Sequence, residues 1–177
     1  MEALESQFGL VECLSDKYVL VDGGALGVGS FGDVRKVQKV GTNELYACKF
    51  MKNCEERAEN WEEYQKIIRE TDILTQLQSG REMCPYILRL HDAFVTCVSG
   101  SDASPSSLTD SLQKRIVSDK TLVLITELLD GEELTVTVQR RKEDRSSVSV
   151  DMVLDIIRQL LTAVVYCHDQ NIIHRDI

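Results

Sequence analysis

The sequence has no clustered cysteine or histidine residues of the kind that bind zinc or build a disulfide framework. Six cysteines are scattered without a C-x-x-C pair, and only three histidines occur in 177 residues. The cysteines are Cys13, Cys48, Cys54, Cys84, Cys97 and Cys167. Scattered thiols of this kind are typical of reduced cysteines in an intracellular protein, and we assign no metal-binding residues.

The chain also lacks a leader sequence and a long apolar run. Residues 1–5 have neither the basic nor the apolar region of a signal peptide. No apolar segment approaches the roughly 20 residues that a membrane-spanning helix needs. The sequence therefore predicts a cytoplasmic or nuclear protein with no membrane partner.

Basic residues are fewer than acidic ones. The sequence has 20 Lys and Arg against 29 Asp and Glu, which gives a net charge of −9 at pH 7. Because nucleic-acid binding needs a positive surface, this balance argues against nucleic acid as the main partner. With 43% hydrophobic and 28% charged residues, the composition is that of a globular protein. The length suits one domain, or a small lobe and part of another.

A glycine-rich stretch near the N-terminus is the first candidate functional motif. Residues 26–34 read LGVGSFGDV and contain the spacing G-x-G-x-x-G. Glycine tolerates positive φ and lets backbone N–H groups approach an anion closely, so the spacing is typical of phosphate-binding turns. Both dinucleotide-binding βαβ units and protein kinases use it, so the pattern alone does not decide between them.

Lys49 favours the protein kinase over the dinucleotide-binding βαβ unit. It lies in the apolar run 45–51, LYACKFM, which is typical of a strand that carries a single cation. In kinases the phosphate-binding lysine lies on such a strand after the glycine loop. The valine spacing over 34–40 would suit the helix of a dinucleotide site, but the turn signal at 41–43 would make that helix very short. No acidic residue follows at the distance a ribose-binding site needs.

A helix is predicted from Asn60 onward. Asn60 and Glu63 have the spacing of a capping box, and apolar residues then recur at helical spacing as far as Leu77. Glu70 lies on the same apolar stripe, where an unpaired carboxylate is costly to bury. We therefore predict an ion pair between Glu70 and Lys49.

A second helix and a short motif complete the chain. Ser149 is predicted to cap a helix with a strong apolar stripe, which ends near Asn171. Residues 174–176 then read His-Arg-Asp. In this order after the glycine stretch, Lys49 and Glu70, the sequence resembles the protein kinase family, whose catalytic loop starts with this motif.

The resemblance implies an α+β fold. It comprises a kinase-like small lobe, with an antiparallel sheet and one helix, then a hinge and the first helices of an incomplete helical large lobe. The expected strands are 18–21, 34–40, 45–51, 87–95 and 121–129.

We expect three segments along the chain. Residues 1–17 are a lead-in, residues 18–129 the small lobe and hinge strand, and residues 130–177 the start of the large lobe. The Ser-rich segment 98–120 is expected to be a flexible insertion. Residues 135–138 alternate as in a strand, whereas the family has a helix there.

The resemblance also assigns functional roles. Lys49 is the phosphate-binding lysine, Glu70 its counter-ion, and Asp176 the base that accepts the proton of the substrate hydroxyl. Thr126 is the gatekeeper. Glu133 is the acid that contacts ribose or a substrate arginine, unless it is only a solvated loop charge. The residues expected to contact ATP are Leu26, Gly27, Val28, Gly29, Ser30, Phe31, Gly32, Val34, Ala47, Lys49, Thr126, Glu127, Leu129 and Glu133.

The function implied is ATP-dependent phosphoryl transfer to Ser or Thr hydroxyls of a protein substrate. The expected substrate has basic residues near the hydroxyl that is phosphorylated. The runs 47–52 and 128–134 are most similar to the calmodulin-dependent, death-associated type of serine/threonine kinase. Mg²⁺ is expected for a complete domain, but in this family an Asn and an Asp located after the position of Asp176 hold the ion, so its ligands are absent from this chain.

We therefore expect a fragment, truncated just after the His-Arg-Asp motif. Alone it should neither transfer phosphate nor stay monomeric, because the apolar stripe over 153–165 needs a large-lobe core to cover it. Two alternatives stay open. One is a non-catalytic, kinase-like module that binds nucleotide or a partner, and the other is a dinucleotide-binding oxidoreductase.

Overall fold

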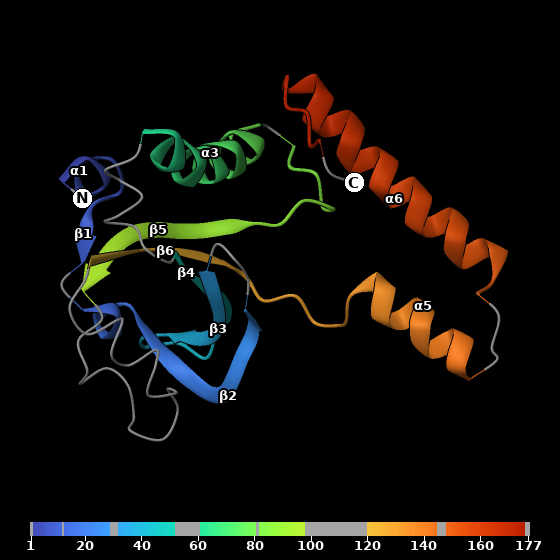
Figure 1. Ribbon diagram of the computed structural model, residues 1–177, viewed down its shortest axis with the longest axis horizontal. Coiled ribbons are helices and arrows are strands. Elements are labelled where there is room, and N and C mark those ends of the chain that lie inside the picture. The colour runs from blue at the N-terminus through green and yellow to red at the C-terminus, as the bar shows by residue number, and fades with distance from the viewer. Residues whose placement is uncertain are drawn as a thin grey trace. The chain divides into compact units, whose positions relative to one another are not determined.

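The described part of the chain forms two units. The computed structural model describes residues 2–11, 13–28, 32–51, 61–80, 82–97, 120–144 and 148–175. The first unit comprises Met1–Thr75 and Arg89–Leu128, and the second comprises Gln76–Leu88 and Leu129–Ile177. All described strands belong to the first unit, and the two C-terminal helices belong to the second (Figure 1).

A six-stranded sheet is the main element of the first unit (Figure 1). Its strands are β1 (Leu10–Val11), β2 (Tyr18–Val28), β3 (Gly32–Lys39), β4 (Leu45–Met51), β5 (Leu90–Cys97) and β6 (Lys120–Glu127). The order is β1-β5-β6-β4-β3-β2, with β1 parallel to β5 and every other pair antiparallel. The predicted strand over 45–51 is confirmed, and the other four predicted strands have shifted ends.

This topology excludes the dinucleotide-binding alternative. A βαβ unit places a helix directly after the glycine turn and returns to a parallel strand. Here residues 32–39 form strand β3, which pairs antiparallel with both β2 and β4. The valine spacing over 34–40 belongs to a strand, because the glycine turn connects two strands of a hairpin.

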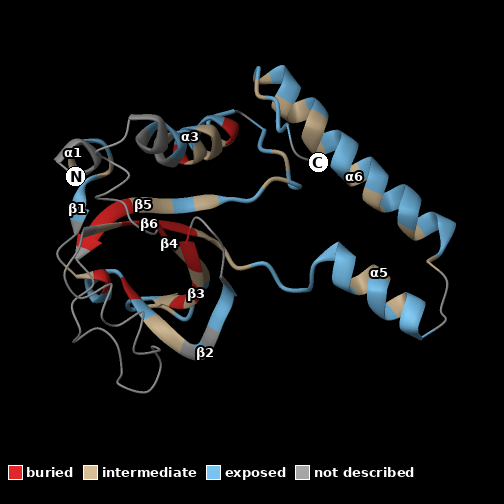
Figure 2. Ribbon diagram, in the orientation of Figure 1, coloured by how far each residue is buried: buried red, intermediate tan, exposed pale blue. Residues whose placement is uncertain are grey.

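Buried side chains form two clusters in the first unit. Many of these residues lie on β4, β5 and β6, where the ribbon of Figure 2 is coloured as buried. One contains Leu14, Tyr18, Val37, Cys48, Phe50, Phe94, Val123 and Ile125, and the other contains Met51, Val95, Leu122 and Leu124. Consecutive residues of a strand point to opposite faces, so the alternation along β4, β5 and β6 assigns the clusters to opposite faces of the sheet.

Helix α3 (Trp61–Gln78) packs on the second of these clusters through Ile68. Thr71 and Leu77 are buried on the same helix. The predicted helix is confirmed, whereas its predicted N-cap Asn60 lies outside the described residues.

The N-terminal residues, for which the sequence predicts no structure, fold onto the first unit. Helix α1 (Glu2–Phe8) is followed by strand β1 and a short 3₁₀ helix, η1 (Leu14–Asp16). Gly9 has φ of 80° and its N–H donates to the carbonyl of Glu5 at 2.8 Å. This left-handed residue ends the helix and directs the chain into the sheet.

Two helices, α5 (Leu134–Glu143) and α6 (Val150–Asp169), belong to the second unit. The strand-like alternation over 135–138 is therefore misleading, and the helix expected from the family is correct. β-Branched residues disfavour a helix by only about 0.5 kcal/mol each. The basic residues of the last turn, at 140–142, stabilise the helix dipole, and Glu132 accepts a hydrogen bond from Thr137 at 2.9 Å.

Helix α6 has the predicted ends. The Ser149 hydroxyl accepts the N–H of Met152 at 3.2 Å, which confirms the N-cap. Asn171 follows the helix with φ of 59°, in the left-handed conformation expected there.

The end of α3 is tied to the end of α6 within the second unit. The Tyr166 hydroxyl donates to the carbonyl of Leu77 at 2.8 Å, and the Gln76 amide donates to the carbonyl of Gln170 at 2.9 Å. The described helices include none that is long and apolar enough to cross a membrane. Of the Ser-rich segment, residues 98–119 lie outside the described part of the chain.

Candidate functional site

Lys49 lies near the middle of β4, and the alternation of that strand decides where its side chain points. Its neighbours Cys48 and Phe50 are buried in the cluster that contains Val123 and Ile125. Lys49 shares the opposite face with Met51, whose cluster α3 covers. The lysine side chain therefore lies on the same face of the sheet as helix α3.

Glu70 meets Lys49 from α3. The Lys49 Nζ lies 2.6 Å from Oε1 and 2.9 Å from Oε2 of Glu70, so the ammonium donates to both carboxylate oxygens. The predicted ion pair is confirmed. The two side chains keep 25% and 39% of their surface exposed, so the ammonium is fixed in direction while still accessible to an anion.

The glycine stretch lies beside this pair. The hairpin of β2 and β3 pairs Gly27 with Val34 and Val28 with Asp33, and β3 in turn pairs Val34 with Lys49. The turn residues at 29–31, which are Gly29, Ser30 and Phe31, lie outside the described residues. The backbone that leads into and out of the turn is thus next to the lysine strand.

Gly32 shows why the third glycine is required. An added Cβ would clash with the carbonyl oxygen of Phe50 and lie 3.1 Å from its carbonyl carbon, and the Lys49 Cγ would be 3.5 Å away. A side chain here would displace the strand or the lysine. At Gly27, by contrast, an added methyl group would meet no atom within 4 Å, so packing does not explain the choice of glycine there.

Three predicted adenine-site residues share the face of the sheet that carries Lys49. Val34 is opposite Lys49, and Ala47 is opposite Thr126 on β6. All three are half-buried, whereas Leu26 on β2 is 50% exposed. The register therefore brings small and apolar side chains beside the lysine on one surface.

Glu127 has contacts that the sequence did not predict. Its N–H donates to the carbonyl of Arg89 at 2.9 Å, and its carboxylate accepts the N–H of Arg89 at 2.8 Å. This reciprocal pair ties the end of β6 to the residue before β5. The two positions are 38 residues apart, so no local pattern could reveal the contact.

Leu129 and Glu133 belong to the second unit. Leu129 is 69% exposed, and Glu133 is the N-cap residue of α5 with no capping hydrogen bond from its side chain. The Glu133 carboxylate accepts the hydroxyl of Thr135 at 3.3 Å. Their expected contacts with adenine and ribose stay predictions from the resemblance.

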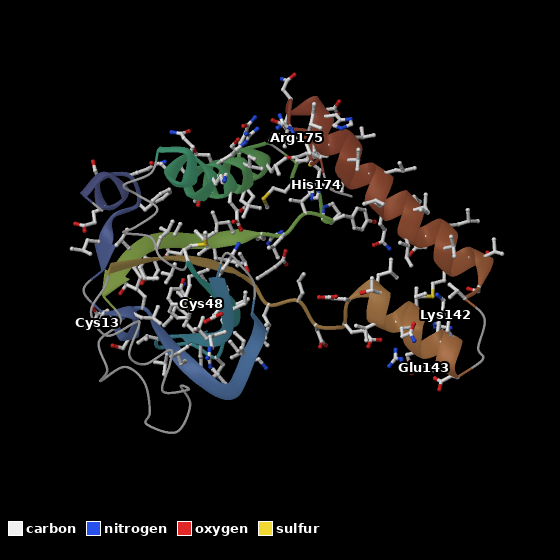
Figure 3. The ribbon with its side chains drawn as sticks, in the orientation of Figure 1. Cys13, Cys48, Lys142, Glu143, His174 and Arg175 are labelled. Atoms are coloured by element: carbon white, nitrogen blue, oxygen red, sulfur yellow. The ribbon has the colours of Figure 1, made fainter. Side chains whose placement is uncertain are left out.

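The His-Arg-Asp motif is only partly described. His174 and Arg175 are exposed after α6 (Figure 3), and Arg175 has φ of 71°. Left-handed backbone is uncommon for a residue with a side chain, so the chain turns sharply just before Asp176. Asp176 itself lies outside the described residues.

Cys48 is adjacent to Lys49 in sequence but chemically remote from it. The thiol is fully buried on the other face of the sheet (Figure 3), and burial raises the pKa of Cys48 far above the usual thiol range. A neutral buried thiol is a poor nucleophile, so Cys48 serves packing.

Comparison with known proteins identifies the domain. The family model described as the protein kinase domain matches residues 20–177. A DNA damage response protein kinase of Saccharomyces cerevisiae is 30% identical over 165 residues, which cover 92% of this chain and 26% of the relative. Death-associated protein kinase 2 of Mus musculus is 30% identical over 156 residues, which cover 88% of this chain and 34% of the relative.

A third relative is the interferon-induced, double-stranded RNA-activated protein kinase of Mus musculus. It is 28% identical over 153 residues, which cover 86% of this chain and 25% of the relative. The chain thus spans between about a quarter and a third of the length of these three proteins. Its small-lobe sheet, its lysine–glutamate pair and the family match over residues 20–177 lead to one conclusion: the chain belongs to the protein kinase domain family.

Proposed function

We propose that the first unit binds ATP and that the domain serves phosphoryl transfer to Ser or Thr hydroxyls of proteins. The observation that carries this proposal is the contact of the Lys49 ammonium with both oxygens of Glu70. A lysine held in this way, beside a glycine hairpin, is suited to bind a phosphate chain. Family membership and the names of the relatives support the reaction class.

The residues around Lys49 fit a nucleotide. Gly32 keeps β3 close to the backbone of Phe50 on β4, and so keeps the glycine hairpin beside the strand that carries Lys49. Val34 and Ala47 offer an apolar surface for a base on the same face of the sheet. Thr126, opposite Ala47, would limit how far the base extends along that face.

The chain's own part in the reaction is electrostatic and positional. ATP, when bound, supplies the phosphoryl group. Glu70 keeps the Lys49 ammonium in place, so the positive charge is already oriented and needs little reorganisation when a phosphate arrives. Asp176 would accept the proton of the substrate hydroxyl, a role that rests on the family motif alone.

No reaction step is assigned to magnesium. The part of the chain that the structure describes contains no group of three or more His, Cys, Asp or Glu side chains that could hold a metal ion. In the family, the magnesium ligands are an Asn and an Asp from elsewhere in the domain.

A protein substrate with basic residues is the class we propose. Glu132 already accepts hydrogen bonds from Thr137 and Arg140 on α5. Glu133 is exposed, and its carboxylate accepts a longer hydrogen bond, of 3.3 Å, from the Thr135 hydroxyl. The Glu133 carboxylate is thus the more accessible of the two for an arginine of a substrate.

Nucleotide binding is tested by titrating the chain with fluorescent ATP. We expect Glu70→Gln to weaken binding modestly, because the ion pair that it removes is partly exposed, and Lys49→Met to weaken it more, because it removes a charge-assisted contact with a phosphate group. Such contacts are worth about 1.5–3 kcal/mol, or roughly 10–100-fold in Kd. Lys39→Met, on an exposed lysine at the end of β3, is the matched control and should bind as the wild type does. Unchanged binding in Lys49→Met would overturn the proposed site.

Phosphoryl transfer needs a separate assay. A longer protein that contains residues 1–177 together with the family's magnesium ligands is incubated with magnesium, γ-labelled ATP and peptides that differ in one arginine, because residues 1–177 alone are expected to transfer no phosphate. We expect transfer that Asp176→Asn lowers by about 10²–10⁴-fold, the usual contribution of a general base. Glu133→Gln should reduce the preference for the arginine peptide. Nucleotide binding without any transfer would instead favour the non-catalytic module.

A further inference from the structure

Helices α1 and α3 pack on the same apolar cluster. Phe8, the last residue of α1, and Ile68 of α3 are both half-buried against the cluster that contains Met51 and Leu124. This cluster lies on the face of the sheet that carries Lys49, because Met51 is two residues from Lys49 on β4. The N-terminal helix therefore supports the same surface that seats the helix of Glu70.

A direct contact joins the two helices. The Gln7 amide donates to the carboxylate of Asp72 at 3.3 Å, although 65 residues separate them in the sequence. Asp72 lies two residues after Glu70, and Ile68 lies two residues before it. The Gln7–Asp72 hydrogen bond thus reaches the part of α3 that presents Glu70.

Strand β1 anchors α1 to the sheet. The Val95 N–H donates to the carbonyl of Gly9 at 2.9 Å, and β1 pairs Leu10 with Val95 and Val11 with Thr96. Val95 and Thr96 are fully buried, so this edge of the sheet is a rigid support. Helix α1 is therefore fixed at its C-terminal end, where Gln7 and Phe8 are located.

The Lys49–Glu70 ion pair forms only if other contacts hold α3 in position. With a quarter or more of each side chain exposed, the Lys49–Glu70 contact is screened by water and contributes little to holding α3 in position. Apolar packing is the stronger constraint on where a helix lies against a sheet. The side chains that pack α3 on this cluster therefore decide whether Glu70 reaches Lys49.

We propose that Phe8 is a positioning residue, through which segment 2–11 holds α3 where Glu70 contacts Lys49. Phe8 is not among the residues proposed to contact ATP, and it acts through the cluster on which Ile68 also packs, with Gln7 adding a polar contact to Asp72. The consequence for ATP affinity rests on the proposed function above, whereas the packing role does not.

The first experiment is a double-mutant cycle on ATP affinity. Phe8→Ala is compared with the wild type, and Phe8→Ala with Glu70→Gln is compared with Glu70→Gln alone. We expect Phe8→Ala to weaken binding roughly 5-fold or more in the wild type, within the usual range of coupling between sites. The effect should be much smaller in the Glu70→Gln background, and Phe8→Leu should restore binding. An equal effect in both backgrounds would overturn the proposal.

The second experiment does not depend on ATP. Amide hydrogen exchange is measured for α3 and β6 in the wild type, Phe8→Ala and Val19→Ala, the last being a control on a β2 side chain that is 51% exposed. Phe8→Ala should speed exchange over 66–77 and leave exchange over 121–126 unchanged, whereas Val19→Ala should leave both regions near wild type. Unchanged exchange over 66–77 would refute the packing role even if ATP binds.

A third variant covers the case in which Phe8→Ala does not fold. Gly9→Ala adds a methyl group that meets no atom within 4 Å, but it strains a backbone with φ of 80°. It should loosen α1 while leaving the cluster intact, and so speed exchange over 66–77. If wild-type protein fails to bind ATP while this exchange response is present, the proposed function fails and the positioning role stands.

Discussion

The two units use apolar residues in opposite ways. In the first unit, strands β4, β5 and β6 bury side chains on both faces of the sheet, and several of these residues are completely inaccessible. In the second unit, helices α5 and α6 have no buried residue, although α6 carries a long apolar stripe. Leu154, for instance, is 60% exposed, whereas Leu122 is fully buried. Figure 2 shows no buried residue on α5 or α6 and buried stretches on β4, β5 and β6.

The difference between the strands and α6 shows that an apolar stripe in the sequence makes burial favourable but does not show that the residues are buried. A strand in the middle of a sheet is flanked by other strands on both sides, and other elements can pack on both of its faces. A helix finds cover only when another element packs on its apolar face. Residues on α6 therefore look like core residues in the sequence and are surface residues in the described structure.

The largest expected effect is the loss of a buried leucine. Leu122→Ala should lower the free energy of unfolding of the first unit by about 2–5 kcal/mol, because it removes buried methyl groups and leaves a cavity. Leu154→Ala makes the same chemical change on α6 and should alter stability by no more than about 0.5 kcal/mol. Urea unfolding followed by circular dichroism measures both. Equal losses would mean that α6 is covered and that the comparison is wrong.

A smaller effect is expected for the cap of α6. Ser149→Ala removes the acceptor for the Met152 N–H and should destabilise the helix by about 1 kcal/mol. Because α6 has no buried side chain, the loss should stay local. Hydrogen exchange should rise over 150–156 without a change in β6. A uniform rise across both units would show that they unfold as one.

The last effect is absent at neutral pH and concerns the first unit at alkaline pH. Burial, with the charge of Asp92 as a lesser cause, raises the pKa of Tyr18 from 10.0 to about 12. Between these values the unfolded chain loses the proton and the folded one keeps it, so stability is full below pH 10 and falls as the pH rises toward 12. Tyr18→Phe should flatten this decline. Unfolding midpoints of the wild type and Tyr18→Phe at pH 9, 10 and 11 test this prediction. An equal decline of the midpoint with pH in both proteins would show that Tyr18 does not cause it.

The sequence alone predicts the core of the candidate site because its chemistry is local. The glycine spacing, the single lysine in an apolar run and the glutamate on an apolar helical stripe each lie within one element. The requirement that a carboxylate on such a stripe has a cation nearby then predicts the pairing of Glu70 with Lys49, which the structure confirms. The N-cap at Ser149 and the left-handed Asn171 follow from equally local rules.

Predictions from alternation were less reliable. Over 135–138 the period-2 pattern indicates a strand, yet the chain forms α5, where the Glu132–Thr137 hydrogen bond and the basic residues of the last turn outweigh small propensity costs. The ends of the strands also shift, by as much as seven residues in β2, because pairing with a neighbour and not composition decides where a strand stops.

Only the tertiary structure decided which distant segments meet. The sequence determined the strand over 45–51, helices α3 and α6 and the residues of the lysine–glutamate pair, since each is a matter of a few neighbouring positions. It did not indicate that Gln7 contacts Asp72, that Glu127 binds the backbone of Arg89, or that residues 2–11 join the sheet beside β5. Such contacts depend on which surfaces are left uncovered once the sheet has formed. A pattern of a few neighbouring residues does not indicate which surfaces these are.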